Sequence, residues 1–314
     1  MDIPLKLSAY VKNSTTLSKV YLKLLEIGKS IYHQTTTQRI HQMDILFIIG
    51  CQRSGTDLIL RIFSRDLNTT VYNEGSILSF LEEPKEFRLR PFDSVKRIIE
   101  KNRAPLIILK PLVETQNILK LLSYFEGSKA LWMYRHYKDV TMSNLKRFGV
   151  KNGINNLRPI IENEPQNWRS EYVPERVKKM VLNHFSEDMN PFDAAALFWV
   201  VRNSLFFDLN LDKHPDVMMC KYEELVSNPL RNVKKIYEFM SHDFPRDNIV
   251  AEVNSNSLGK GENIKLTPEI DRLCNELLEK LNASYISGGY EATAVTPIAV
   301  RGSDCTRQQK GMGS

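Results

Sequence analysis

Long apolar runs are missing from this sequence. No stretch approaches the roughly 18 consecutive apolar residues that a membrane-spanning helix needs, so we expect no transmembrane segment. Residues 1–32 also lack the compact apolar core and the small-residue cleavage site of a signal peptide. Residues 14–32 instead have the spacing of an amphipathic helix, which we expect to pack on the main domain. Contact with a membrane surface through Lys19, Lys23 and Lys29 is the alternative.

Cysteine is scarce as well. The chain has four cysteines that lie far apart and form no C-x-x-C pair: Cys51, Cys220, Cys274 and Cys305. This pattern argues against a disulfide framework and against a zinc site. No group of His, Asp and Glu residues has metal-ligand spacing either. We therefore expect a protein without a bound metal in a reducing compartment, the cytoplasm.

Charge of one sign is not strongly in excess. The sequence has 43 Lys and Arg against 37 Asp and Glu, a net charge of +6. An excess that is so mild and so evenly spread suits anionic ligands but does not indicate a nucleic-acid partner. With 314 residues, 42% of them hydrophobic, the chain can build a sizeable core. We expect an N-terminal helical extension over 1–43, a single main domain over 44–286 and a flexible tail over 287–314.

The most informative stretch is residues 44–63. An apolar run over 45–49 meets Gly50, Gly55 follows five residues later, and apolar residues at helical spacing come next. Strand, glycine-bounded loop and helix together form a P-loop-type cradle for an anion, with a plain turn as the alternative. A nucleotide-hydrolysing loop of this spacing carries Lys after the second Gly. Here Thr56 occupies that position, and the cation of the loop is Arg53.

The rest of the chain repeats the alternation of strand and helix. Buried-type strands are predicted at 106–109, 130–134 and 217–220, with a short β-like piece at 69–72. The fold class is therefore α/β: a parallel sheet of the P-loop type in one domain, with helices on both faces. Ligands bind at the carboxyl ends of such strands. Arg53, Lys110 and Arg135 each follow a strand, so we expect all three to face one crevice.

Several connecting segments also carry expectations. We expect a helix to begin at 78–81 and the charge-rich residues 82–103 to form a solvated surface rather than a ligand site. Residues 151–169 are rich in Asn, Pro and Gly and predict an irregular lid or insertion. A long helix is expected over 192–211, with Trp199 in the core rather than under an adenine ring. A last helix is expected over 267–281, with Thr267 as its N-cap.

Several of these motifs, in this order, resemble the superfamily of sulfotransferases that use 3′-phosphoadenosine 5′-phosphosulfate (PAPS). The loop at 52–56 resembles the family's loop for the 5′-phosphosulfate. The strand end at 132–135, with Ser143 eight residues later, is similar to its 3′-phosphate motif. The segment 221–229 resembles the signature Y-E-x-L-x-x-x-P, and 255–260 resembles the late basic loop that closes over the nucleotide.

The resemblance is to bacterial-type members, with an active-site pattern similar to that of the tyrosylprotein sulfotransferases. Those enzymes have an Arg in the loop, where Arg53 stands in this chain. A catalytic Glu follows about twenty residues later, and Glu74 falls at that place. Their catalytic Lys ends the strand before the 3′-phosphate Arg, and Lys110 falls there.

The resemblance implies metal-independent in-line transfer of a sulfuryl group from PAPS to a hydroxyl. Arg53 would bind the bridging and sulfuryl oxygens, and Lys110 would neutralise charge on the leaving side. Glu74 would be the general base; a structural Glu paired with Arg53 or Arg135 is the alternative. The nucleotide-binding residues implied by the motifs are Ser54, Gly55 and Thr56 for the 5′-phosphate, and Arg135, Ser143, Ser257 and Lys260 for the 3′-phosphate and its cover.

Two positions do not follow directly from this picture. The family usually has Thr where this chain has Asp57, and a carboxylate there must turn away from the anionic ligand or pair with a cation. The alternative interpretation of Asp57 is structural: it would be an acidic residue in the first turn of a helix, where a negative charge is favourable. His136 adjoins Arg135, and we expect a surface or capping role for it rather than that of a base.

Two other functions and the acceptor remain open from sequence alone. The alternatives are a catalytically degenerate nucleotide-binding protein and a P-loop kinase. The acceptor pocket is expected to be lined by about 76–90 and 149–190, which contain aromatic, apolar and basic residues without a recognisable code. A carbohydrate, a lipid-like alcohol, a phenol and a peptide tyrosine are all compatible with this composition, and so is any oligomeric state.

Overall fold

A five-stranded parallel sheet forms the centre of the protein. The computed structural model describes residues 28–29, 32, 43–82 and 87–290. Its strands are β1 (Asp44–Gly50), β2 (Thr69–Tyr72), β3 (Leu106–Leu109), β4 (Lys129–Tyr134) and β5 (Val217–Lys221), in the order β2-β3-β1-β4-β5. All five strands lie where the sequence predicts them. Four of them, β1, β3, β4 and β5, are apolar runs that are buried on both faces of the sheet, whereas the short edge strand β2 is only partly buried.

Helices connect these strands and extend beyond them. The described helices are α3 (Thr56–Ser64), α4 (Phe92–Ile99), α5 (Ile118–Tyr124), α6 (Tyr137–Phe148), α7 (Asn152–Ile161), α8 (Glu175–His184), α9 (Pro191–Asp208), α10 (Tyr222–Ser227), α11 (Pro229–Phe239) and α12 (Pro268–Ser287). Short 3₁₀ turns are η1 (Leu112–Asn117), η2 (Leu211–Lys213) and η3 (Asp247–Val250).

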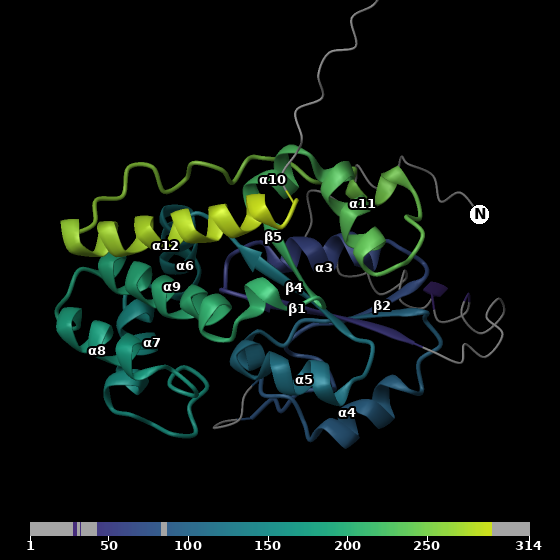
Figure 1. The fold of residues 1–314 in the computed structure, drawn as a ribbon, viewed down its shortest axis with the longest axis horizontal. Coiled ribbons are helices and arrows are strands. Elements are labelled where there is room, and N and C mark those ends of the chain that lie inside the picture. Colours follow the sequence, from purple (N-terminus) through teal and green to yellow (C-terminus); the bar gives the residue numbers. More distant parts are fainter. Residues whose placement is uncertain (1–27, 30–31, 33–42, 83–86, 291–314) are drawn as a thin grey trace, which may run out of the picture.

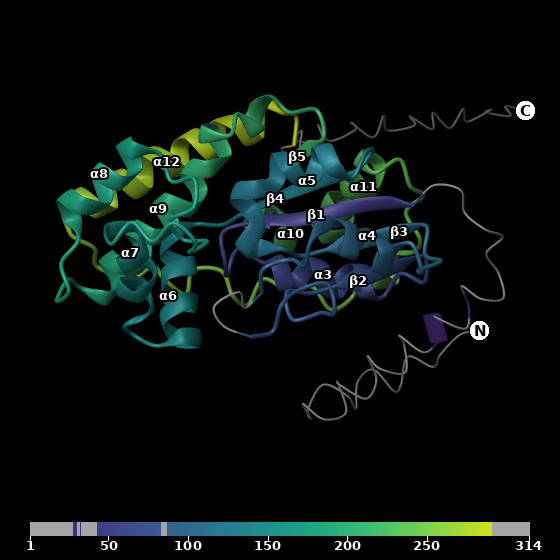
Figure 2. The same cartoon turned by 90° about the horizontal axis from the view of Figure 1, so that it is seen from below.

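Helices cover both faces of the sheet, as predicted. Successive side chains of a strand point to opposite faces, and β1 shows this directly. Phe47 and Ile49 pack into a core with α4, α5 and α9, whereas Leu46 and Ile48 pack into a second core with α3 and α11. Figure 1 shows α3 and α11 on one side of the strands and α4 and α5 on the other, and Figure 2 gives the view from the side of α4 and α5.

A helical layer lies beside the β4–β5 end of the sheet. Its centre is α9, which is buried along nearly its whole length and contacts α6, α7 and α12. A helix that is apolar on all sides belongs in a core, and Trp199 on α9 is fully buried there. The Trp199 indole N–H donates to the carbonyl of Arg135 at 3.1 Å, which confirms the expected core position.

Two predicted segments differ in the structure. Residues 78–81 do not begin a helix. They pair with 87–90 in a hairpin-like arrangement, in which Phe80 and Arg88 are joined by a backbone hydrogen bond of 2.8 Å. Residues 151–169 are not irregular throughout, because their first half forms α7 with Pro159 inside it. Packing of α7 against α9 outweighs the poor helix propensity of its Asn, Gly and Pro residues.

The prediction of a purely solvated surface over 82–103 is wrong for Arg88. Its guanidinium donates to Glu114 Oε1 at 2.7 Å and to Glu171 Oε2 at 2.7 Å. Gln116 and Asn117 also donate to the Glu171 carboxylate. This network joins the 87–90 segment to η1 and to the loop before α8, and it holds the outer wall of a cavity described below.

The chain outside the main domain is described only in part. Most of the amphipathic helix expected over 14–32, and the tail beyond 290, lie outside the described residues. Lys29 is described, and it is buried: its ammonium donates to the carbonyl of Thr69 at 3.1 Å and to the carbonyl of Phe63 at 3.4 Å. Lys29 therefore contacts the main domain, which agrees with the packing interpretation.

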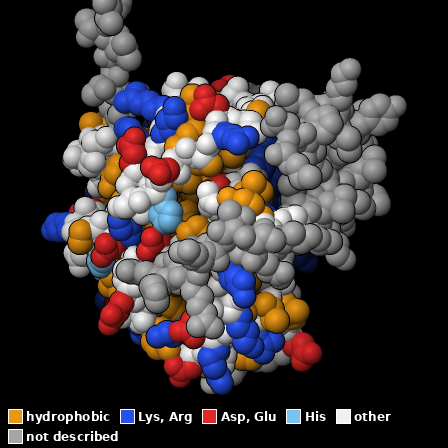
Figure 3. All heavy atoms as spheres, turned by 90° about the vertical axis from the view of Figure 1, so that its right-hand side faces the viewer, with side chains coloured by type: hydrophobic (Ala, Val, Ile, Leu, Met, Phe, Trp, Pro, Cys, Tyr) orange, Lys and Arg blue, Asp and Glu red, His pale blue; other side chains and the backbone are white. Residues whose placement is uncertain are grey.

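No helix among the described residues is both long and apolar enough to cross a bilayer. On the face drawn in Figure 3, outside the grey residues, lysine and arginine side chains alternate with aspartate and glutamate, and hydrophobic side chains lie between them. Basic side chains on that part of the surface are therefore mixed with acidic ones, in keeping with the small net charge of +6.

Gly50 offers a test of how β1 meets β4. It has a φ of +122°, and an added Cβ would lie 2.3 Å from the carbonyl oxygen of Met133. Gly149 has a similar φ of +90° but open space around it. We expect Gly50→Ala to lower the free energy of unfolding by about 3 kcal/mol and Gly149→Ala by about 1 kcal/mol. Urea unfolding of both variants measures the difference, and equal losses would contradict the close approach.

Candidate active site

The loop between β1 and α3 is shaped as an anion cradle. Arg53 and Gly55 have positive φ angles of 67° and 92°, and Gly55 caps α3. Within the described residues, the N–H groups of Arg53, Gly55 and Thr56 find no hydrogen-bond acceptor. The Ser54 hydroxyl is buried and also lacks a partner among them. A loop that leaves donors free at a helix N-terminus is suited to hold a phosphate or sulfate group.

Four charged side chains meet beside this loop. The Lys110 ammonium lies between two carboxylates, 2.5 Å from Asp57 Oδ1 and 3.0 Å from Glu74 Oε2. The second oxygen of Asp57 lies 3.9 Å from the Arg53 guanidinium. Glu74 comes from the turn after β2, Lys110 from the end of β3 and Asp57 from the first turn of α3. The sequence placed Arg53, Glu74 and Lys110 at one site, and the structure brings them together.

Asp57 is explained by this arrangement. Both interpretations that the sequence allowed are observed, because Asp57 stands in the first turn of α3 and its carboxylate also pairs with Lys110 and Arg53. The alternative interpretation from sequence paired Glu74 with Arg53 or Arg135. In the structure Glu74 pairs with Lys110 instead.

The surroundings of Glu74 and Asp57 shift the pKa values of the two carboxyl groups in opposite directions. Burial raises the pKa of Glu74, the ammonium of Lys110 lowers it and the nearby charge of Asp57 raises it, so that overall the pKa lies above its ordinary value. Asp57 is also partly desolvated, but Lys110 and Arg53 hold its pKa below the ordinary value. Burial alone would lower the pKa of Lys110, yet the two carboxylates raise it overall, so the ammonium stays charged. Glu74 is therefore the carboxylate that takes a proton more readily.

A second group of predicted residues lies at the end of β4. The Arg135 guanidinium is buried and stacks on the ring of Tyr222 at 4.3 Å. One of its terminal nitrogens donates to Asp139 at 3.0 Å and to the carbonyl of Ser257 at 2.5 Å. Its Nε is buried and has no partner among the described residues. Arg135 thus keeps hydrogen-bonding capacity for an anion.

The late loop is fixed over Arg135 by Asp139. The Asp139 carboxylate accepts hydrogen bonds from the N–H groups of Gly259 at 3.1 Å and Gly261 at 2.8 Å. An added Cβ on Gly261 would lie 2.2 Å from the carbonyl oxygen of Lys138, so this loop approaches α6 closely. Lys260, between the two glycines, is exposed and lines the same cavity as Arg135.

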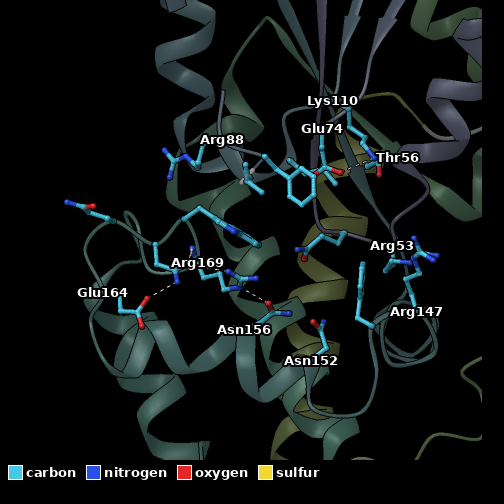
Figure 4. Close-up of a pocket in the computed structure, with 18 of the residues that line it drawn as sticks. Arg53, Thr56, Glu74, Arg88, Lys110, Arg147, Asn152, Asn156, Glu164 and Arg169 are labelled. Carbon is cyan, nitrogen blue, oxygen red and sulfur yellow. Dashed lines mark hydrogen bonds and ion pairs between the residues drawn. The ribbon is translucent and has the colours of Figure 1, made fainter. Parts of the chain in front are cut away.

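The expected single crevice is in fact two neighbouring cavities. The larger, of about 880 Å³, is lined by Arg53, Thr56, Glu74 and Lys110 (Figure 4). The smaller, of about 600 Å³, is lined by Arg135, Ser143, Ser257 and Lys260. Arg53 lies between them, because its Nε donates to the Ser143 hydroxyl at 3.0 Å. The division arises because β1 lies between β3 and β4, so its loop separates the ends of those strands.

Other residues of interest have structural positions. His136 caps α6, with its ring accepting from the N–H of Lys138, and burial lowers its pKa; the capping prediction is confirmed. The three described cysteines are buried free thiols. In the part of the chain that the structure covers, no group of His, Cys, Asp and Glu is arranged to hold a metal ion.

Some residues of the two cavities were not singled out in the sequence. Asp139 stands four residues after Arg135, in the first turn of α6, and this spacing of opposite charges was the available signal. Arg61 and Lys146 line the smaller cavity, and Arg147 and Arg169 line the larger one. For these four no signal existed, because a basic residue on a helix or loop looks the same in sequence whether or not it borders a cavity.

Comparison with known proteins identifies the class. The family model of the sulfotransferase domain matches residues 43–261, so the chain belongs to the sulfotransferase family of transferases. Among curated proteins none matches the sequence of the chain.

Solved structures of sulfotransferases show weak overall similarity. The sulfotransferase domain of the Synechococcus PCC 7002 olefin synthase is 16% identical, with 79% of this chain and 98% of that chain covered and a TM-score of 0.43. Sulfotransferase STF9 from Mycobacterium avium is 12% identical, with 88% and 81% covered and a TM-score of 0.47. Mouse sulfotransferase SULT7A1, solved in a complex with PAP, is 15% identical, with 83% and 90% covered and a TM-score of 0.39.

The charge cluster predicts how Glu74 titrates. Because the negative charge of Asp57 raises the pKa of Glu74 and competes with it for Lys110, Asp57→Asn should lower that pKa. The measurement is an NMR pH titration with ¹³C-labelled glutamate carboxyls, in which Glu74→Gln identifies the resonance. Asp188→Asn is the control, because Asp188 is an exposed residue before α9. This substitution should leave the pKa of Glu74 unchanged. A Glu74 pKa that stays the same or rises in Asp57→Asn would show that the two carboxylates do not interact.

Proposed function

We propose that this chain transfers a sulfuryl group from PAPS to a hydroxyl acceptor by a metal-independent in-line reaction. The observation that carries the proposal is the convergence of Arg53, Lys110 and Glu74 beside a loop with free N–H donors. Membership of the sulfotransferase family agrees with this chemistry. We further propose that the protein works in the cytoplasm, since its described cysteines are free thiols.

The residues present fit a donor with two phosphate-bearing ends. At the loop, the Ser54 hydroxyl and the N–H groups of Gly55 and Thr56 would hold the 5′-phosphate. In the smaller cavity, the free Nε of Arg135 and the hydroxyl of Ser143 would hold the 3′-phosphate. Lys260 and Ser257 would cover this end from the late loop. An ATP-binding loop would need Lys at the position of Thr56.

The donor supplies the sulfuryl group, and the side chains of the cluster supply the charge and the proton acceptor. The planar guanidinium of Arg53 directs two hydrogen bonds to oxygens of the transferred group. The charged Lys110 neutralises the negative charge that develops on the leaving 5′-phosphate oxygen. Glu74 takes the proton of the attacking hydroxyl, a role suited to a carboxylate whose pKa lies above its ordinary value.

Arg53 is the residue whose loss should matter most for transfer. Arg53→Ala removes the directed charge and should lower the rate by about 10²- to 10³-fold, the usual effect of removing one transition-state donor. Arg97→Ala, an exposed arginine on α4, is the control. The assay measures transfer of ³⁵S-sulfate from PAPS, with circular dichroism to confirm the fold. Near-normal turnover of Arg53→Ala would reject the mechanism.

The role of Glu74 predicts a separate effect on turnover. Glu74→Gln keeps an acceptor for Lys110 but cannot take a proton, so kcat should fall by about 10²- to 10⁴-fold while PAP affinity changes little. In the unmodified protein kcat should fall as pH decreases through the raised pKa of Glu74, since a protonated carboxyl is no base. That acid limb should vanish in the variant. Glu279→Gln, an exposed residue of α12 that lines neither cavity, is the control. Unchanged kcat in Glu74→Gln would exclude Glu74 as base.

A further inference from the structure

The larger cavity extends well beyond the charged cluster. Its volume of about 880 Å³ lies at the upper end of the range of roughly 300–1,000 Å³ for small-molecule sites. Glu74, Lys110 and Arg53 occupy one end, and the remaining walls come from α7, the loop over 164–169 and the segment around Arg88 (Figure 4). An acceptor that fills this space makes most of its contacts away from the reacting hydroxyl.

Side-chain amides are prominent in the lining. Five of them border the cavity: Gln52, Asn152, Asn156, Gln166 and Asn167. Asn152 and Asn156 stand one turn apart on the same face of α7, across the cavity from Glu74 and Lys110 in Figure 4. Their placement on a helix gives them fixed positions opposite the reacting groups.

These amides have unused hydrogen-bonding capacity. The Asn152 Nδ2 donates to Asn144 at 2.6 Å, and no described residue bonds its Oδ1. The Asn156 Oδ1 accepts from the Arg169 Nε at 2.7 Å, and its Nδ2 has no partner among the described residues. The Oε1 of Gln52 is buried and equally without one. The cavity therefore presents both donors and acceptors that a ligand must satisfy.

Aromatic rings form another part of the wall. Phe87, Phe148 and Trp168 line the cavity. The guanidiniums of Arg169 and Arg202 lie 4.5 Å and 5.0 Å from the centre of the Trp168 indole. Arg202 is itself buried and donates to the carbonyl of Leu112 at 3.1 Å. Trp168 is thus a fixed platform rather than a mobile surface ring.

We propose that the acceptor is a carbohydrate; this rests on the proposed sulfuryl transfer. Sugar hydroxyls both donate and accept, which matches the open amide groups of Gln52, Asn152 and Asn156, and the C–H face of a sugar ring packs on an aromatic ring. A phenol or an alkyl alcohol offers one hydroxyl, which is consumed at Glu74. Such ligands would leave the amides dehydrated and unpaired, and sites built for hydrogen bonds reject them for that reason.

In the reaction one sugar hydroxyl oxygen forms a bond to sulfur and gives its proton to the Glu74 carboxylate. The bond between sulfur and the bridging oxygen breaks, and its electron pair stays on the 5′-phosphate of the departing PAP. The other hydroxyls remain with the amides on α7, which fixes the hydroxyl that faces Glu74.

The test is an acceptor panel with ³⁵S-PAPS. Its sugars are maltotetraose, N-acetylchitotetraose and a hyaluronan tetrasaccharide; its other members are 4-nitrophenol, dodecanol in detergent and a tyrosine-containing peptide. We expect label on at least one sugar and little on the others. If PAP binds, as seen by a thermal shift, but label goes only to a phenol, alcohol or peptide, or to nothing, the inference is overturned. Absence of PAP binding would instead reject the proposed function.

A variant pair on α7 tests the amide contacts. Asn152→Leu should raise the KM for the sugar about tenfold, the usual effect of losing one hydrogen bond, with the KM for PAPS unchanged. Asn155→Leu is the matched control, since Asn155 is an exposed residue of the same helix that does not line the cavity. Saturation-transfer NMR of the sugar with PAP-bound protein gives the same comparison without turnover. Equal sugar binding by both variants would show that α7 does not hold the acceptor.

Discussion

The parallel pairing of β1 with β3 on one side and β4 on the other is the constraint on which the site depends. It aligns Phe47 with Leu109 and Gly50 with Met133. The strands therefore end at one edge of the sheet, where their next residues supply the loop of Arg53, Lys110 and Arg135. Gly50 allows the closest part of this approach, because no side chain fits against the Met133 carbonyl. The charges of the site are brought together by backbone pairing, before any side chain interacts.

Once they are together, the charges are balanced locally. Lys110 is buried, and an unpaired buried ammonium would be costly; Asp57 and Glu74 compensate it. The same arrangement makes the two carboxylates unequal, since Asp57 also interacts with Arg53 and is more exposed. Glu74 is left as the carboxylate with the raised pKa. A residue that looked out of place in the loop thus contributes to the contrast on which acid–base chemistry depends.

Much of the fold could be predicted from sequence, because strands buried on both faces are continuous apolar runs and the glycine spacing marks the loop. The pairing of Asp57 with Lys110 could not, since the two residues are 53 positions apart and only the sheet register brings them together. The segment 78–81 was misassigned for a similar reason. Its apolar residues suit a helix, but it pairs with the extended segment 87–90 and is therefore extended itself. In α7, packing on α9 overrides unfavourable local propensity. Arg88 was assigned to solvent because its partners Glu114 and Glu171 are remote in sequence.

We propose that a donor with both a 5′- and a 3′-phosphate lies along the loop between the two cavities, with its sulfuryl group toward the acceptor cavity. Isothermal titration calorimetry with PAP and, separately, with ADP and Mg²⁺ decides whether the protein binds such a donor. PAP should bind at least about tenfold more tightly, since a phosphate contact to a buried arginine contributes on the order of 1.5–3 kcal/mol. Tighter binding of ADP with Mg²⁺, or no binding of PAP, would contradict it.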